Sequence, residues 1–228
     1  MTLDTRRHDE LFDKKTFAAD VHVIGAGGVG SALVRQLAKL GVGTNSAFHL
    51  WDGDTVAPHN IANQAYDPHD IDLKKTDALR EHVRVWTDGI EAISHDRFVT
   101  DKVPLSGMVF LCLDDMQARK DICEASLWGN EEVPMVIETR MDASYIVIHS
   151  FDPNDPLHVE CWNEYWYPDV KTENEAGCGG PVSVISTVEM TASMAVQQFI
   201  AHVGGANDFY HQVQLNLRTW ELKKATWQ

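Results

Sequence analysis

A glycine-rich segment is the first group of residues whose types and spacing point to chemistry. The segment Gly25-Ala26-Gly27-Gly28-Val29-Gly30 directly follows four mostly apolar residues and directly precedes a stretch with apolar residues at helical spacing. At such a strand–turn–helix junction the first glycine allows a tight turn. The second lets backbone approach phosphates, and the third lets helix pack on strand. Free amides at the helix start then face the anion. We predict a nucleotide phosphate site at Gly25, Gly27, Gly28 and Gly30.

A carboxylate is placed to complete this site. Asp52 ends a second apolar run, residues 47–51, where a carboxylate is expected to accept hydrogen bonds from a ribose hydroxyl. The alternative is that the glycines serve only tight packing, but the strand–turn–helix context favours nucleotide binding. The turn alone does not distinguish NAD from ATP.

The order of apolar runs predicts the elements that position these residues. Strands are expected at 21–24, 47–51, 107–113, 134–139 and 145–151, and helices at 31–40, 74–85, 116–127 and 181–203. This alternation predicts a single α/β domain over residues 1–228, with a Rossmann-like, mostly parallel sheet and helices on both faces. Residues 1–17 are expected to form an N-terminal arm, 152–180 a long crossover loop, and 209–223 one or two late strands.

Composition excludes several classes of protein. The 228 residues include 34 acidic and 19 basic side chains, a net charge of −15, which repels nucleic acid and anionic membranes. No run of about 18 apolar residues is present, so no membrane span is expected. The four cysteines form no Cys-x-x-Cys pair, and the polar N-terminus lacks the apolar stretch of a signal peptide, which together predict a cytoplasmic protein.

Further motifs follow the glycine turn in a fixed order. They are Asp52-Gly53-Asp54-Thr55-Val56, His59-Asn60-Ile61-Ala62-Asn63-Gln64, Asp70-Ile71, Lys75, Leu113-Asp114-Asp115-x-x-x-Arg119 and Ala176-Gly177-Cys178-Gly179-Gly180-Pro181. This series resembles the ThiF/MoeB/HesA family, the bacterial relatives of ubiquitin-activating enzymes. The resemblance spans roughly Arg6 to Val203.

The resemblance implies an enzyme that adenylates a carboxylate with ATP and Mg²⁺, usually the C-terminal glycine of a ubiquitin-like protein, and that forms a homodimer. Lys75 would hold the phosphates as a point charge, and Asp114 would coordinate magnesium. Asp54, Asn60 and Gln64 would shape the nucleotide pocket. The alternatives for these residues are structural: a solvated lysine, a helix N-cap at Asp114, and turn caps in the loop.

The chain departs from the family pattern at one charged position. Asn63 stands where the family has an arginine, and a neutral amide cannot make cationic contacts to a phosphate. The candidates for a replacement cation are Lys74, Arg140 and the N-terminal Arg6 and Arg7, which in some relatives reach the site from the neighbouring subunit.

Cysteines raise two further questions about chemistry. The resemblance makes Cys178 a candidate nucleophile for a thioester, against the simpler view that it is a small buried side chain. The four-cysteine zinc site of many relatives is absent, since only Cys161 and Cys178 lie where parts of it would fall, and no zinc is expected.

Four functions remain open at this point. The leading hypothesis is ATP-dependent adenylation of a protein or peptide carboxylate. The second is an ATP-binding scaffold of the same fold that has lost catalysis, as Asn63 suggests. The third is an NAD-dependent oxidoreductase, which shares the turn and Asp52 but leaves Lys75 and Asp114 without a role. The fourth is adenylation of a small molecule or a tRNA base.

Overall fold

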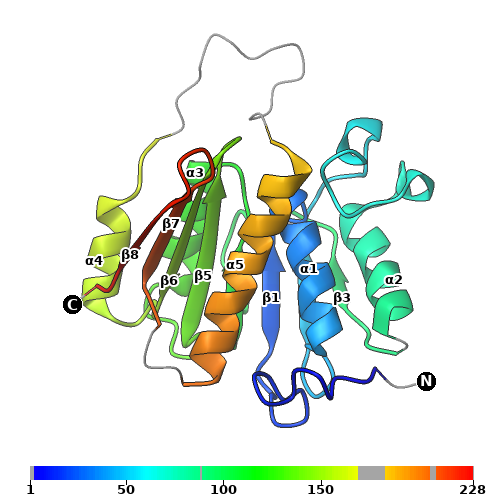
Figure 1. Cartoon of the computed structure of the whole chain (residues 1–228), viewed down its shortest axis with the longest axis horizontal. Helices are drawn as coiled ribbons and strands as arrows, with labels where there is room; N and C mark the ends of the chain where they lie inside the picture. The colour runs from blue at the N-terminus through cyan, green and yellow to red at the C-terminus, as the bar shows by residue number, and fades with distance from the viewer. Residues whose placement is uncertain (1–2, 88, 169–182, 206–208, 228) are drawn as a thin grey trace.

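A single eight-stranded sheet forms the centre of the protein (Figure 1). The structure is a computed structural model that describes residues 3–87, 89–168, 183–205 and 209–227. The strands lie in the order β3-β2-β1-β4-β5-β6-β7-β8. Their bounds are β1 Val21–Ile24, β2 Phe48–Trp51, β3 Ile93–His95, β4 Met108–Leu111, β5 Met135–Met141, β6 Tyr145–Phe151, β7 Gln212–Asn216 and β8 Glu221–Ala225.

The sheet has a parallel half and an antiparallel half. β3, β2, β1, β4 and β5 are parallel, whereas β6, β7 and β8 continue from β5 as an antiparallel meander. β1 occupies the centre of the parallel half, with Ile24 paired to Trp51 on one side and Leu111 on the other. The carboxyl ends of these strands therefore meet at one edge, where open α/β sheets bind their ligands.

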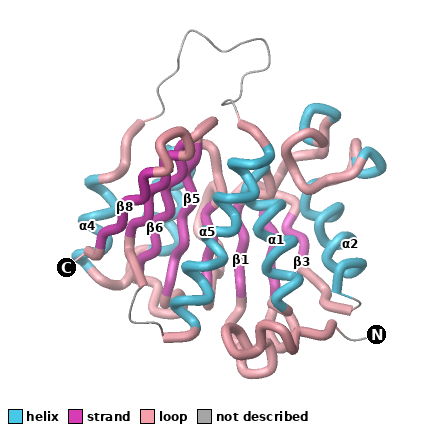
Figure 2. Tube along the Cα trace, in the orientation of Figure 1, coloured by secondary structure: helices cyan, strands magenta, loops and turns pink. Residues whose placement is uncertain are grey.

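Helices cover both faces of the sheet (Figure 2). Helices α1 (Gly28–Leu40), α2 (Lys75–Thr87) and α5 (Ile185–Val203) contribute to one apolar core. Helix α3 (Met116–Ile122), the π-helical turn η3 (Cys123–Leu127) and α4 (Pro156–Glu164) contribute to a second core on the opposite face. Helix α5 buries residues four apart, including Thr187, Thr191 and Ala195, because its packed face lies against α1, β5 and β6.

The expected fold class is confirmed, with two local differences. The part of 152–180 that is described contains α4, which begins after Asp155 accepts a hydrogen bond from the Leu157 amide at 2.8 Å. The first part of the region predicted as a crossover loop is therefore helical. The second difference is the edge strand β3, which the sequence analysis missed because three residues are too few to show an alternating pattern.

The N-terminal arm packs at the end of the sheet away from the glycine turn. Phe12 is buried and lies 5.2 Å from the Phe17 ring and 5.4 Å from that of Phe199, measured between ring centroids. His8 Nε2 lies 3.4 Å from the carbonyl oxygen of Leu40, the last residue of α1. The arm consists of turns and contains no helix. Because α1 has 13 residues, roughly 20 Å separates the arm from the start of that helix.

Candidate active site

The glycine turn joins β1 to α1 in a conformation that requires glycine at two positions. Gly25 has φ +94°, and a Cβ there would lie 2.7 Å from the carbonyl oxygen of Cys112. A Cβ on Gly30 would lie 1.8 Å from the carbonyl oxygen of Gly25. By contrast, a Cβ on Gly27 would meet no described atom within 4 Å. The first and third glycines thus close the turn, while the second leaves its backbone open to a ligand.

The start of α1 offers its amides to an anion. Gly27 is the N-cap of the helix, without a side-chain hydrogen bond to the first turn, and that turn contains no acidic residue. Unsatisfied amides and the positive end of the helix dipole together favour phosphate at such a position.

Asp52, the residue that follows β2, is hydrogen-bonded to the glycine turn. Its Oδ2 accepts a hydrogen bond from the Ala26 amide at 2.7 Å, and its Oδ1 accepts one from the Asp54 amide at 2.8 Å. The residue is only 8% exposed, so these bonds are protected from water. An ionised carboxylate accepts about four hydrogen bonds, which leaves lone pairs for a ribose hydroxyl. The predicted ribose acceptor therefore also has a structural role.

Lys75 lies buried beside this pair of aspartates. Its side chain is 8% exposed, and its Nζ lies 2.9 Å from Asp54 Oδ2. The Lys75 amide also donates to the Asp54 carbonyl oxygen at 3.0 Å. The Asp54 side chain is about half exposed. Water can therefore solvate its carboxylate if a phosphate replaces it as the partner of the Lys75 ammonium group. The alternative of a freely solvated lysine is wrong.

Asp114 follows β4 on the same edge of the sheet. The Cys112 amide donates to the Ile24 carbonyl oxygen at 2.8 Å, and Leu113 lies against Gly25. Asp114 is exposed, whereas its neighbour Asp115 caps α3 by accepting a hydrogen bond from the Ala118 amide at 2.7 Å. The cap is thus Asp115, and the Asp114 carboxylate is available to a ligand.

The loop after β2 holds the remaining predicted residues. Asn60 is buried, and its Oδ1 accepts the Ala57 amide at 2.8 Å, so it caps a turn. Asn63 donates from Nδ2 to Ser183 Oγ at 2.6 Å, and its carbonyl oxygen lies near Gly28. Gln64 Oε1 is buried and has no hydrogen-bond partner among the described residues. The loop is therefore folded back onto the glycine turn.

A model of a protein family, described as the ThiF family, matches residues 3–228. The chain belongs to the ThiF family. The resemblance seen in the sequence is therefore confirmed.

Two curated members of the ThiF family resemble the chain over most of its length. One is the sulfur carrier protein ThiS adenylyltransferase of Escherichia coli (strain K12), 23% identical over 93% of this chain and 86% of that protein. The other is the molybdopterin-synthase adenylyltransferase of Salmonella typhimurium, 24% identical over 82% of this chain and 74% of that protein. The expected reaction class, ATP-dependent adenylyl transfer, is confirmed at this level, without a specified substrate.

Solved structures with the same fold support the assignment of architecture. PaaA matches with a TM-score of 0.73 and 17% identity, over 96% of this chain and 66% of that chain. E. coli MccB with MccA-N7isoASN matches with a TM-score of 0.73 and 15% identity, over 96% of this chain and 67% of that chain. The chain thus spans about two thirds of the length of these ThiF-fold proteins.

The four candidate cations for the Asn63 position lie in different places. Lys74 Nζ is 3.1 Å from Asp96 Oδ1 and also donates to the Gly53 carbonyl oxygen. Arg6 pairs with Asp4 at 2.6 Å, and both Arg6 and Arg7 belong to the arm at the far end of α1. Within one protomer these arginines therefore lie far from the glycine turn, and their contribution from a neighbouring subunit stays a prediction. Arg140 lies in β5 and is bound to Glu138.

Arg140 belongs to a buried charge network that the sequence analysis did not predict. Glu138 is fully buried and accepts from Arg119 Nη1 at 2.9 Å and from Arg140 Nε at 2.9 Å. His149 Nδ1 lies 2.8 Å from its other oxygen, and Trp162 Nε1 lies 3.3 Å away. Although burial opposes the charge, Arg119, His149 and Arg140 hold the pKa of Glu138 well below its usual range.

This network reaches the Asp114 turn through Arg119. Arg119 Nη2 donates to the carbonyl oxygen of Leu113, the residue before Asp114. Arg119 belongs to a motif that resembles the family pattern, but no sequence pattern indicated the network around it. The other members of the network lie on β5, β6 and α4, far apart along the chain.

Two predictions concern Cys178 and membrane-spanning helices. Cys178 lies in 169–182, outside the described residues. Within the parts of the chain that the structure describes, no helix combines the length and apolarity needed to cross a bilayer.

Proposed function

We propose that the chain uses ATP to adenylate a carboxylate at the end of a small protein or peptide. The observation that carries this proposal is the convergence of the open Gly27 backbone, Asp52 and the buried Lys75 at one edge of the sheet. The names of its relatives support the substrate class: one acts on the sulfur carrier protein ThiS, and MccB was solved with MccA. A ubiquitin-like protein is the finer form of the proposal.

The chemistry requires alignment and charge neutralisation more than covalent help. An oxygen of the substrate carboxylate attacks the α-phosphorus of ATP. The bond from that phosphorus to the bridging oxygen breaks, and pyrophosphate leaves with the electron pair. The amides of the glycine turn orient the phosphates, and Lys75 offsets the negative charge on the departing pyrophosphate.

The donor set fits magnesium at Asp114. Mg²⁺ prefers one or two carboxylates together with phosphate oxygens, and Asp114 is an exposed carboxylate that does not cap the following helix. When bound, the ion would neutralise phosphate charge as the pyrophosphate departs. The role of this chain is to hold Asp114 at the end of β4, which Arg119 supports through the Leu113 carbonyl oxygen.

Isotope exchange between pyrophosphate and ATP tests the proposal directly. A panel of ubiquitin-like proteins and of peptides with free C-termini should include a substrate that supports exchange. Asp114→Ala should lower the exchange rate by about 100-fold or more, the usual loss of a charge-stabilising group. Asp115→Ala is the matched control, because it removes a helix cap worth about 1 kcal/mol but leaves the phosphate site intact.

A scaffold without catalysis is the second candidate, and Asn63 favours it. Asn63 is neutral and donates to Ser183, and the nearby cations Lys74 and Lys75 each already have an acidic partner. Calorimetry would then show ATP binding, and every carboxylate in the panel would fail to support exchange.

Two finer proposals concern the assembly and the fate of the adenylate. Arg6 or Arg7 could serve the site only from a neighbouring subunit, so we propose a homodimer. Light scattering should give twice the chain mass, and Arg6→Ala with Arg7→Ala should slow exchange. Attack of the Cys178 thiolate on the acyl carbon of the adenylate would release AMP and leave a thioester. The product would be a thiol-sensitive protein–substrate conjugate that Cys178→Ala lacks. Neither result affects the test of adenylation itself.

A further inference from the structure

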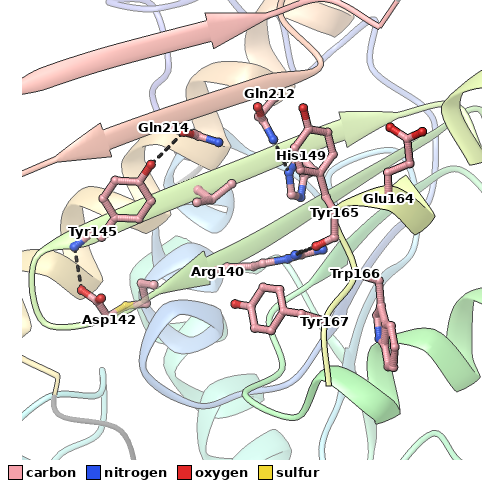
Figure 3. A pocket seen from close by; sticks show the side chains of 12 residues that line it. Arg140, Asp142, Tyr145, His149, Glu164, Tyr165, Trp166, Tyr167, Gln212 and Gln214 are labelled. Atoms are coloured by element: carbon pink, nitrogen blue, oxygen red, sulfur yellow. Dashed lines mark hydrogen bonds between the residues drawn. The ribbon is translucent and has the colours of Figure 1, made fainter. Parts of the chain in front are cut away.

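A cavity of about 440 Å³ lies over the antiparallel half of the sheet, on the face that carries the Glu138 network. Figure 3 shows its lining: side chains from β5, β6 and β7 form the floor, and the residues that follow α4 form one wall. The volume is in the range of pockets that bind a small ligand group. The residues proposed for the nucleotide site, Gly27, Asp52, Lys75 and Asp114, do not line this cavity.

Arg140 is the buried basic residue of this cavity, and its hydrogen bonding is incomplete. Its Nε donates to Glu138, and its Nη1 donates to the Tyr165 carbonyl oxygen at 2.6 Å. Its Nη2 is buried and has no hydrogen-bond partner among the described residues. The side chain as a whole is only 8% exposed, so water does not readily replace that partner. In Figure 3 the guanidinium lies between Tyr165 and Tyr167, and it lies 5.5 Å from the Tyr167 ring centroid.

The charge of the network is unbalanced. Arg119 and Arg140 both bind the single carboxylate of Glu138, and burial lowers the pKa of His149 despite its contact with Glu138. Two buried cations thus share one buried anion. An unpaired buried charge is costly, so a second carboxylate that reached Arg140 would complete the pairing. Guanidinium groups bind carboxylates in a forked geometry that uses both Nη groups.

Two acidic residues at the rim oppose this charge only weakly. Asp142 Oδ1 already accepts the Ser144 and Tyr145 amides at 2.8 Å, and Glu164 is exposed. Exposed charges are screened by water and salt, whereas the Arg140 guanidinium is not. The remaining polar side chains of the lining are neutral: His149, Trp166, Gln212, Gln214 and the tyrosines. Such a lining suits a carboxylate on an apolar stem.

The position of the cavity relates it to the proposed substrate. β1, which leads into the glycine turn, is separated from β5 by β4, and β7 is two strands further. At about 4.8 Å per strand, the cavity lies roughly 10–20 Å across the sheet from β1. An extended chain spans that distance with about three to six residues.

We propose that this cavity binds a second carboxylate, carried by the substrate chain about three to six residues before the carboxylate that is activated. This inference rests on the proposed function and assigns it a specificity determinant: an acidic residue near the end of the substrate. Arg140 holds that residue, and Gln214 lies in the same lining.

Calorimetry without ATP tests binding separately from catalysis. The probes are nine-residue glycine–serine peptides with a single Glu or Gln at the third to sixth position from the C-terminus, and free glutarate. At one position the Glu peptide should bind about tenfold more tightly than its Gln counterpart, the effect of one charge-assisted hydrogen bond.

Variants connect the preference to this cavity. Gln214→Glu keeps the acceptor that binds the Tyr145 hydroxyl at 2.7 Å, but it adds a negative charge to the lining. It should reduce the preference to less than about threefold, as should Arg140→Gln. Gln36→Glu is the matched control, because Gln36 contacts Ser193 on the opposite face of the sheet and should keep the preference. If Arg140→Gln does not fold, Gln214→Glu alone tests whether the preference for Glu arises in this cavity.

Three results would overturn the proposal. One is the absence of any Glu-over-Gln preference, including no measurable binding of any probe. Another is a preference that Gln214→Glu leaves unchanged. A third is binding of glutarate as tight as that of the best peptide, which would assign the cavity to a free small carboxylate. Exchange activity without a Glu preference would reject this inference alone, and a Glu preference without exchange would reject the proposed function alone.

Discussion

Alanine at Gly27 and at Gly30 should have opposite effects, although the two substitutions add the same methyl group. A Cβ at Gly27 meets open space within 4 Å, and φ of −73° suits an L-residue. Its effect on the free protein should lie between neutral and about 1 kcal/mol stabilising, because alanine restricts the unfolded chain. Yet the methyl group would occupy the space that phosphates need, so the Kd for ATP should rise at least tenfold, about 1.4 kcal/mol.

Gly30→Ala should instead destabilise the fold. The added Cβ would lie 1.8 Å from the Gly25 carbonyl oxygen, so the turn must move by more than 1 Å. Overpacking of this kind costs about 1–3 kcal/mol or more. Melting curves and calorimetry with a non-hydrolysable ATP analogue measure both quantities for each variant. Unchanged ATP affinity in Gly27→Ala would refute the assignment of its backbone to the phosphates, and an unchanged Tm in Gly30→Ala would refute the packing.

Three further predictions concern charge and the core. Glu138→Gln leaves Arg119 and Arg140 without a buried anion and should cost about 3–5 kcal/mol, which urea unfolding measures. Burial lowers the pKa of His22 to about 3, so its neutral form stabilises the fold above pH 6.5. Between pH 7.5 and 5 this residue should cost about 2 kcal/mol of unfolding free energy, and His22→Gln should flatten that slope. Phe199→Ala should lower stability by about 3–5 kcal/mol without changing ATP affinity, because Phe199 is fully buried against the arm.

The parts of the site that the sequence predicted are those encoded by local spacing. The glycine turn, Asp52 and Lys75 each lie within a few residues of the end of a strand or the start of a helix. The structure places them at the same strand and helix ends that the sequence pattern predicts. Even there, the sequence did not reveal that Asp115 rather than Asp114 caps α3. Two adjacent aspartates offer the same chemistry, and only the backbone geometry of the turn distinguishes them.

The parts that sequence reasoning missed depend on contacts between distant segments. Glu138 is an acidic residue within a strand, which usually indicates an exposed position. It is buried because Arg119, Arg140 and His149 converge on it from three elements. The helix α4 was missed for a different reason: its signal, Asp155 followed by Pro156, was present but was outweighed by the polar and aromatic composition of the region.

The placement of arginine suggests how the chain can depart from the family pattern at Asn63. Near the glycine turn, Lys75 pairs with Asp54 and Lys74 pairs with Asp96. Under the proposed function, Asp54 would release Lys75 when a triphosphate binds. The excess of buried positive charge lies instead on β5, where two guanidinium groups share Glu138. A substrate that brings a carboxylate to Arg140 would satisfy that excess, and Arg119 connects the same network to the turn that carries Asp114. Under this arrangement a carboxylate of the substrate, rather than the nucleotide, balances the buried positive charge on β5.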